Sequence, residues 1–267
     1  MDAPKQGELK LNPLADRQAH RDPTHFHTHF MTTDSRQFQL QGFHHEKSLF
    51  TAEETAGFRT EVERYLRDVA PDRTGGDAIK AKDVTDKHVP DDQFVFLARM
   101  DQHDDFFNQF KQDPRLANLA SELLGGEVEV QHVQFFDVIP GISQPTSPHQ
   151  DAQIFLLEPS HAVTFWIPLS EMKEEHGCLH YVPGSHWDGY LPHYNTHLAL
   201  QNDSGCRERG VPMEVMPGDL LAHHCFTIHY SSENLSGNSR WALAVHFYPK
   251  GSERLREADW KRRNLRR

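Results

Sequence analysis

Cysteine is scarce in this sequence, and its placement excludes small cross-linked folds. Cys178, Cys206 and Cys225 are the only cysteines among 267 residues, and none belongs to a C-x-x-C pair. A zinc knuckle and a disulfide framework both need closely spaced or paired cysteines. We therefore expect neither, and this cysteine usage fits a reducing compartment.

Long apolar runs and an excess of basic charge are also lacking. No stretch approaches the roughly 20 apolar residues that cross a bilayer, and the first thirty residues show no secretory signal pattern. The formal net charge is −11, which would repel a phosphate backbone, and only residues 261–267 form a basic cluster. We expect a soluble cytoplasmic protein with neither a membrane nor a nucleic acid as partner.

Histidine, in contrast, is abundant. The chain has 20 histidines, and imidazole is the commonest transition-metal ligand in proteins. Three of them, His25, His27 and His29, lie in a polar segment without apolar periodicity, so residues 1–36 read as a flexible leader. Residues 37–250 are expected to form one domain, followed by a charged tail over 251–267.

The first part of the domain mixes strand and helix signals. Alternation at Phe38-Gln39-Leu40 predicts a strand over residues 38–43. Thr51-Ala52-Glu53-Glu54 has the form of a capping box. The helix that it starts should bury a stripe made of Phe58, Val62, Tyr65, Leu66 and Val69. Residues 72–92 read as a loop, 94–100 as a buried strand, and 114–124 as a helix that ends at Gly125-Gly126.

From residue 128 onward the chain reads as one short strand after another. The expected strands cover residues 128–139, 154–157, 163–169, 179–182, 219–224 and 240–248. Many short strands separated by glycine and proline turns imply a sandwich or a barrel. The early helices would pack on its outside.

A metal site is suggested first by the H-x-D pair His149-Gln150-Asp151. On a strand, the two outer side chains point to the same side and can reach one ion. The pair is weak evidence alone, because this spacing often arises by chance. Two histidines and one carboxylate would leave three positions of an octahedral ion open for a bidentate co-substrate and oxygen. Composition leaves the second histidine open among His176, His180, His186, His193, His197, His223, His224, His229 and His246.

An arginine narrows this choice. A 2-oxoglutarate enzyme needs a cation for the distal carboxylate of its co-substrate, and the fork of arginine binds a carboxylate bidentately. The segment that contains His229 leads through a turn at residues 234–238 into a strand that opens with Arg240. A hairpin of this kind would bring His229 and Arg240 to neighbouring strands that face one pocket.

Several linked motifs resemble the phytanoyl-CoA dioxygenase family of iron(II)- and 2-oxoglutarate-dependent oxygenases. They agree in order and spacing over residues 38–250. The matching residues are Ser147-Pro148-His149-Gln150-Asp151, Glu158-Pro159, Trp166, Gly177-Cys178-Leu179, Val182-Pro183-Gly184-Ser185-His186, Pro217-Gly218-Asp219, and the series His229, Ser231, Asn234, Ser236, Ser239 and Arg240.

The resemblance implies a site and a fold. His149, Asp151 and His229 would bind Fe(2+), while Arg240 and Ser231 would hold the far carboxylate of 2-oxoglutarate. Trp166 and Gln134 would line the same pocket, and Gln150 is a weaker candidate beside the ligands. The implied fold is mainly β (α+β), a double-stranded β-helix (a jelly-roll, cupin-like barrel) with flanking N-terminal helices.

The implied activity is that of a dioxygenase with 2-oxoglutarate and O2 as co-substrates. It would hydroxylate a C–H bond of a small-molecule substrate, or catalyse a desaturation or cyclisation variant, and release succinate and CO2. Phe155, Tyr190, His193 and Tyr248 are possible pocket residues, although aromatic side chains on barrel strands are more often core. Some family members contact 2-oxoglutarate through a lysine in the strand that corresponds to residues 94–100. This chain has none there, and Arg99 is the candidate replacement.

Other classes of protein remain as alternatives. A differently metallated cupin-like isomerase or a non-catalytic binding barrel could share the fold, but the isomerase would not need Arg240 beside Ser231. Zinc hydrolysis tolerates two histidines and an aspartate yet leaves the co-substrate residues unexplained. A serine hydrolase is disfavoured because the G-x-S-x-G elbow is missing.

Overall fold

A computed structural model of the chain describes residues 33–195 and 198–265. The chain divides after Met31, and residues 32–267 form one compact unit. The leader predicted over residues 1–36, with its three histidines, lies almost entirely outside the described residues. No helix in the described ranges is both long and apolar enough to span a bilayer.

Two antiparallel sheets form the framework of the described chain. The larger has the strand order β1-β9-β6-β11-β4-β3-β2 and the smaller the order β10-β7-β8. The strands of the larger sheet are β1 (Phe43–Glu46), β2 (Ala78–Lys80), β3 (Phe94–Leu97), β4 (Val128–Val138), β6 (Val163–Pro168), β9 (Leu220–His224) and β11 (Arg240–Pro249). Those of the smaller sheet are β7 (Leu179–Tyr181), β8 (Val211–Met213) and β10 (His229–Ser231).

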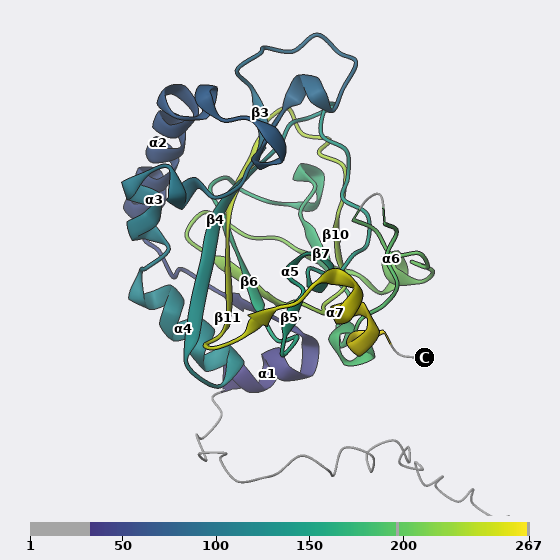
Figure 1. Cartoon of the computed structure of the whole chain (residues 1–267). Helices are drawn as coiled ribbons and strands as arrows, with labels where there is room; N and C mark the ends of the chain where they lie inside the picture. The colour runs from purple at the N-terminus through teal and green to yellow at the C-terminus, as the bar shows by residue number, and fades with distance from the viewer. Residues whose placement is uncertain (1–32, 196–197, 266–267) are drawn as a thin grey trace, which may run out of the picture. The chain divides into compact units, whose positions relative to one another are not determined.

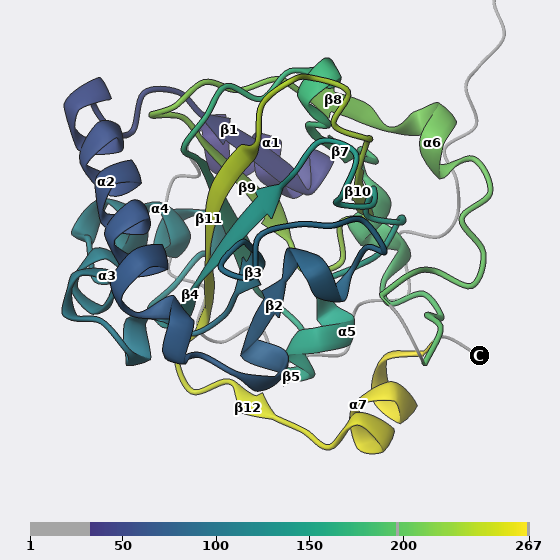
Figure 2. The ribbon, with the colours of Figure 1, turned by 90° about the horizontal axis from the view of Figure 1, so that it is seen from above.

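Helices cover the outer face of the larger sheet. Figure 1 and Figure 2 show α2 (Ala52–Asp68), α3 (Asp105–Phe110) and α4 (Pro114–Leu124) on one side of β4 and β11, with β7 and β10 on the other. The main apolar core lies between these helices and the sheet and includes Val62, Tyr65, Phe107, Leu116 and Phe135. The predicted mainly β fold with N-terminal helices is confirmed.

Local signals placed two helices correctly. The Thr51 side chain accepts from the Glu54 N–H while the Glu54 carboxylate accepts from the Thr51 N–H, so the predicted capping box is present. α4 starts at Pro114 and ends at Gly125, whose φ of 76° lies in the left-handed region. Glycine enters this region without the steric penalty that other residues meet.

Alternation along β11 gives its two faces different surroundings. Leu243, Val245 and Phe247 point into the core beneath the helices, while Ala242 and Ala244 point into a second core between the two sheets. Successive side chains of a strand face opposite sides of the sheet. Arg240 has the same parity as Ala242 and therefore points toward the inside of the barrel.

Three of the expected strand placements are wrong. Residues 33–41 form α1 (Thr33–Gln41), in which Phe38 is 2% exposed and Leu40 is 63% exposed. A strand would have put both residues on one face, whereas a helix separates them. Residues 152–155 form a short helix, α5 (Ala152–Phe155), instead of a strand. The predicted hairpin between the strands of His229 and Arg240 is not formed, because β10 and β11 belong to different sheets.

The remaining elements are short. They are β5 (Leu157–Glu158), β12 (Glu253–Arg254), α6 (Cys206–Arg209), α7 (Glu257–Asn264) and the 3-10 turns Ala70–Asp72, Gly75–Asp77, Ala81–Asp83, Met100–Gln102, Glu174–His176 and Ser185–Asp188. The segment expected to be a charged tail contains β12, which pairs with β5, and α7. Trp260 of α7 is fully buried, and its Nε1 donates to the Leu157 carbonyl at 2.8 Å.

Trp260 should therefore anchor the C-terminal segment. Trp260→Ala is expected to lower the free energy of unfolding by about 3–5 kcal/mol, because it empties a buried site and removes a hydrogen bond. Denaturant unfolding measures the change. Trp187→Ala is the control, since Trp187 is 62% exposed, and it should change stability far less. Equal effects of the two substitutions would contradict the anchoring role.

Candidate metal centre

Three potential metal ligands meet where two distant chain segments are paired. His149 and His229 form a bridge in which each backbone N–H donates to the other's carbonyl at 3.0 Å. Asp151 follows as the N-cap of α5. The H-x-D pair was expected on one strand, and this expectation is wrong. One ligand atom from each side chain lies within 4.8 Å of the other two, and this is the one such group found among the described residues.

The spacing of the ligand atoms fits a single ion. Asp151 Oδ1 lies 3.8 Å from His149 Nε2 and 3.6 Å from His229 Nε2. Two atoms that each lie about 2.1 Å from one ion are at most about 4.2 Å apart. Two imidazole nitrogens and one carboxylate oxygen at these distances are a donor set that suits a divalent transition metal.

Both imidazoles turn an unprotonated nitrogen toward this point. His149 Nδ1 donates to the Ser147 carbonyl at 2.8 Å, and His229 Nδ1 donates to the Thr227 carbonyl at 3.0 Å. A neutral ring that donates from Nδ1 keeps its lone pair on Nε2. Burial lowers the pKa of His149 and lowers that of His229 well below its ordinary value, so both rings are neutral and able to bind a metal.

The Asp151 carboxylate is ionised although it is buried. Burial alone would raise the pKa of Asp151, but its surroundings, among them the hydrogen bond from His223, hold it well below its ordinary range. Its Oδ2 accepts from the Thr164 hydroxyl at 2.5 Å and lies 3.0 Å from His223 Nε2. One carboxylate oxygen is thus engaged by neighbours, while the other faces the two imidazoles.

A cavity of about 560 Å³ contains these three side chains. Its deep wall comes from the inward positions of β4, β6 and β11. Residues of β2, β3 and α5 also line the cavity. Gln134, Phe136, Thr164, Trp166, His223, Arg240 and His246 are in the lining, as are the apolar residues Ile79, Phe96, Ile154, Phe155 and Leu198 and the charged residues Asp77, Arg99 and Arg254.

Arg240 brings a buried positive charge to this cavity. Its side chain is 3% exposed, and burial lowers its pKa to about 10. Nη1 donates to the Gly177 carbonyl, and the guanidinium lies 5.7 Å from the centre of the Trp166 ring. In the described part of the chain Nε has no hydrogen-bond partner, and no carboxylate forms an ion pair with this guanidinium. A buried cation in this state suits an anionic ligand.

The structure separates the other predicted co-substrate residues into two groups. Trp166 and Gln134 line the cavity that contains the candidate metal ligands. Ser231 is buried beside it, and its Oγ accepts from the N–H of Thr146, which does line the cavity. Gln150 is fully buried, and its side chain donates to the carbonyls of Gly189 and Phe226, so it holds the backbone between the candidate ligands.

Of the substrate-pocket candidates, Phe155 lines the cavity. Tyr190, His193 and Tyr248 are absent from the part of its lining that the structure describes. Arg99, the candidate replacement for the family lysine, also lines it, and its Nη1 donates to Asp77 at 2.5 Å. The charge of Arg99 is therefore already paired with that of Asp77, whereas Arg240 forms no ion pair among the described residues.

The histidines considered as third ligands have different environments. His223 and His246 line the cavity, and His197 lies outside the described residues. The others contact residues elsewhere. His176 accepts from the Lys173 N–H, His180 stacks on Tyr230, and His186 donates to the Gln39 carbonyl. His193 accepts from the Gln150 N–H, and His224 lies 3.0 Å from His161.

The contacts of His223 and Thr164 with Asp151 had no signal in the sequence, because 72 and 13 residues separate the partners.

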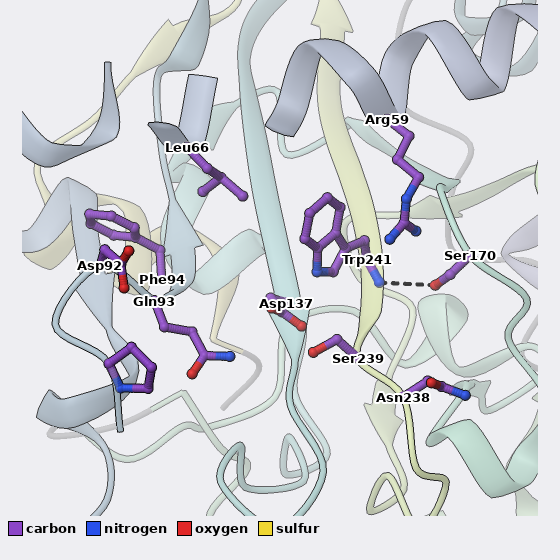
Figure 3. A pocket seen from close by; sticks show the side chains of 11 residues that line it. Arg59, Leu66, Asp92, Gln93, Phe94, Asp137, Ser170, Asn238, Ser239 and Trp241 are labelled. Atoms are coloured by element: carbon purple, nitrogen blue, oxygen red, sulfur yellow. Dashed lines mark hydrogen bonds between the residues drawn. The ribbon is translucent and has the colours of Figure 1, made fainter. Parts of the chain in front are cut away.

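A second pocket of about 580 Å³ lies behind the wall that carries Arg240. Figure 3 shows Trp241 and Asp137 side by side, with Arg59 of α2 next to the indole. The backbone N–H of Trp241 donates to the Ser170 hydroxyl. The Arg59 guanidinium lies 4.6 Å from the centre of the Trp241 ring. Asp137 is buried, and burial raises its pKa to about 6.

A jelly-roll barrel with two imidazoles and one carboxylate at a deep cavity is the arrangement of mononuclear non-haem iron oxygenases. A sequence model of the family "Phytanoyl-CoA dioxygenase (PhyH)" matches residues 38–242. The chain belongs to this family, and the predicted resemblance is confirmed.

Two curated relatives show how far the similarity extends. Phytanoyl-CoA dioxygenase 1 of Oryza sativa is 29% identical over 167 residues, which cover 61% of this chain and 59% of the rice protein. Phytanoyl-CoA dioxygenase domain-containing protein 1 of Mus musculus is 27% identical and covers 84% of this chain and 75% of the mouse protein. The matched region thus spans less than two thirds of the rice relative.

Solved structures support the fold. The epimerase SnoN in complex with Fe3+, alpha ketoglutarate and nogalamycin RO superposes with a TM-score of 0.69 at 20% identity, covering 85% of this chain and 88% of its own. EvdO2 from Micromonospora carbonacea var. aurantiaca complexed with 2-oxoglutarate has a TM-score of 0.64 at 19% identity, covering 83% and 91%. The predicted cupin-type fold is confirmed.

The raised pKa of Asp137 makes a prediction for stability against pH. The folded state favours the protonated carboxyl, so this stabilisation is present below the ordinary pKa of 3.8 and is lost as pH rises through about 6. Asp137→Asn cannot ionise. The difference in unfolding free energy, wild type minus variant, should therefore fall by about 2–3 kcal/mol across this window. Denaturant unfolding at several pH values measures it, and parallel profiles would contradict the assignment.

Proposed function

We propose that this protein is an iron(II)- and 2-oxoglutarate-dependent dioxygenase that hydroxylates a C–H bond of a small-molecule substrate and releases succinate and CO2. One observation carries the proposal. The candidate triad of His149, Asp151 and His229 shares a cavity with Arg240, whose buried guanidinium forms no ion pair with a carboxylate of the described residues. Zinc hydrolysis would use the triad but would leave this cation unexplained.

His149 and His229 would hold iron through Nε2, and Asp151 through Oδ1. Bound iron(II) would supply the redox chemistry that couples oxygen reduction to decarboxylation of 2-oxoglutarate and oxidation of the substrate. The three side chains would occupy neighbouring positions of the ion and leave the others to the co-substrates. Their burial excludes bulk water from the site, which strengthens each electrostatic contact in it.

Arg240 would bind the far carboxylate of 2-oxoglutarate. Its Nε and the remaining guanidinium nitrogen can offer two parallel N–H donors to a carboxylate. Trp166 lies against the guanidinium, and Gln134 is on the adjacent wall of the cavity. Direct contact of Ser231 with the carboxylate stays a prediction, since its Oγ already accepts from the Thr146 N–H.

The apolar part of the cavity lining would receive the primary substrate. Its apolar lining of Ile79, Phe96, Ile154, Phe155 and Leu198 suits the hydrocarbon part of a small molecule. The SnoN structure contains nogalamycin RO, a small molecule, within a similar fold. Hydroxylation is the finer part of the proposal, because the structural neighbours include an epimerase and a carbocyclase.

An anaerobic titration with iron(II) and 2-oxoglutarate tests the proposal through the visible charge-transfer band of the chelate. Wild-type protein should develop the band. Asp151→Ala and His229→Ala should lose it because they lose iron. Arg240→Ala should still bind iron but need at least about 30-fold more 2-oxoglutarate, since it removes a buried charge partner.

His180→Ala is the matched control, because this buried histidine lies outside the described lining of the cavity. It should keep the band at the wild-type co-substrate concentration. The absence of a band in wild type would refute the proposal. A band without succinate release in air, over a panel of candidate substrates, would favour the non-catalytic binding barrel.

A further inference from the structure

The imidazole of His223 lies between a candidate metal ligand and a buried tyrosine. Its Nε2 is 3.0 Å from Asp151 Oδ2, and its Nδ1 is 2.9 Å from the Tyr181 hydroxyl. All three residues are buried, and the His223 ring also lies 4.2 Å from the ring of His229. His223 comes from β9 in the larger sheet and Tyr181 from β7 in the smaller one, so this contact crosses the barrel.

The chemistry of the partners assigns the protons. An ionised carboxylate only accepts hydrogen bonds, so Nε2 of His223 carries a proton and donates to Asp151. When this ring carries only that proton, Nδ1 has the lone pair and accepts from the Tyr181 O–H. Tyr181 thereby selects the tautomer that faces Asp151. In metal sites, groups that contact a ligand in this way set its orientation.

Asp151 Oδ2 is engaged twice. Besides His223, it accepts from the Thr164 hydroxyl, whose Oγ1 in turn lies 3.1 Å from His246 Nδ1. These donors approach from β9 and β6, neighbouring strands in the sheet. With Oδ2 held on that side, Oδ1 is the oxygen that faces the Nε2 atoms of His149 and His229.

We infer that His223, oriented by Tyr181, is a positioning residue that makes Asp151 bind the metal through Oδ1 alone. This inference rests on the proposed function. A carboxylate that bound through both oxygens would occupy one of the positions needed for 2-oxoglutarate and oxygen. The Tyr181–His223–Asp151 chain keeps that position available.

His223 is not placed as a further ligand. Among the described residues, the group of ligand atoms that lie within 4.8 Å of one another comprises His149, Asp151 and His229 and omits His223. Its Nε2 is directed at the outer oxygen of the carboxylate instead. A purely packing role is the other reading, because the His223 ring also lies 5.1 Å from that of Tyr181. The two roles respond differently to a change that removes only a proton donor.

Three substitutions separate these roles. His223→Phe keeps an aromatic ring but removes the donor, and His223→Gln restores an amide donor of similar reach. Tyr181→Phe removes one hydroxyl and leaves the ring packing. Tyr65→Phe is the control, since it removes another buried hydroxyl, one that accepts from Arg73 in the core beneath the helices.

The readouts are iron(II) affinity in anaerobic titration and the visible spectrum of the cobalt(II)-substituted protein, which reports coordination number. His223→Phe should weaken iron binding about 10- to 100-fold and alter the cobalt spectrum. Tyr181→Phe should act in the same direction with a smaller loss, while His223→Gln and Tyr65→Phe should stay near wild type. Circular dichroism verifies that each variant is folded.

Two results would overturn the inference. In the first, Tyr181→Phe and every His223 variant that folds have the same iron affinity and the same cobalt spectrum as the wild-type protein. The other is equal impairment of His223→Phe and His223→Gln, which indicates packing alone. Failure of the proposed function is a separate outcome, since wild-type protein would then give no charge-transfer band with iron(II) and 2-oxoglutarate. A wild-type band with unchanged variants would refute the positioning role and leave the dioxygenase proposal intact.

Discussion

The backbone pair between His149 and His229 is the constraint on which the site depends. Two reciprocal hydrogen bonds of 3.0 Å join segments that are 80 residues apart in the chain, and they place the two imidazole rings 4.1 Å apart. The turn into α5 then returns Asp151 to the same point. The two backbone bonds and this turn thus fix where the three side chains start.

Alternate side chains of β11 face two different environments, the cavity on one side of the sheet and the core beneath the helices on the other. Arg240, Ala244 and His246 face the cavity, while Trp241 and Leu243 face the helices. Burying a guanidinium without an ion-paired carboxylate costs several kcal/mol. An anionic co-substrate would recover part of it on binding. Under the proposed function, stability and co-substrate binding would be coupled through Arg240.

Local signals allowed much of the fold and the central residues of the candidate site to be predicted. The capping box at Thr51 and the Pro114 helix start depend on near neighbours, and the family motifs selected His229 and Arg240. Contacts between distant segments could not be predicted from the sequence. Phe38 and Leu40 fit a strand as well as a helix until tertiary burial separates them, and the hairpin prediction failed because the chain crosses from one sheet to the other between His229 and Arg240. The contacts of His223 could not be read from a sequence of 20 histidines.

The most direct test of the central claim is an anaerobic crystal structure of the protein with iron(II) and 2-oxoglutarate. It measures where the metal lies and which atoms bind it. The account predicts iron about 2.0–2.2 Å from His149 Nε2, Asp151 Oδ1 and His229 Nε2, with the far carboxylate of 2-oxoglutarate on the Arg240 guanidinium. A metal bound elsewhere, or 2-oxoglutarate bound without contact to Arg240, would contradict it.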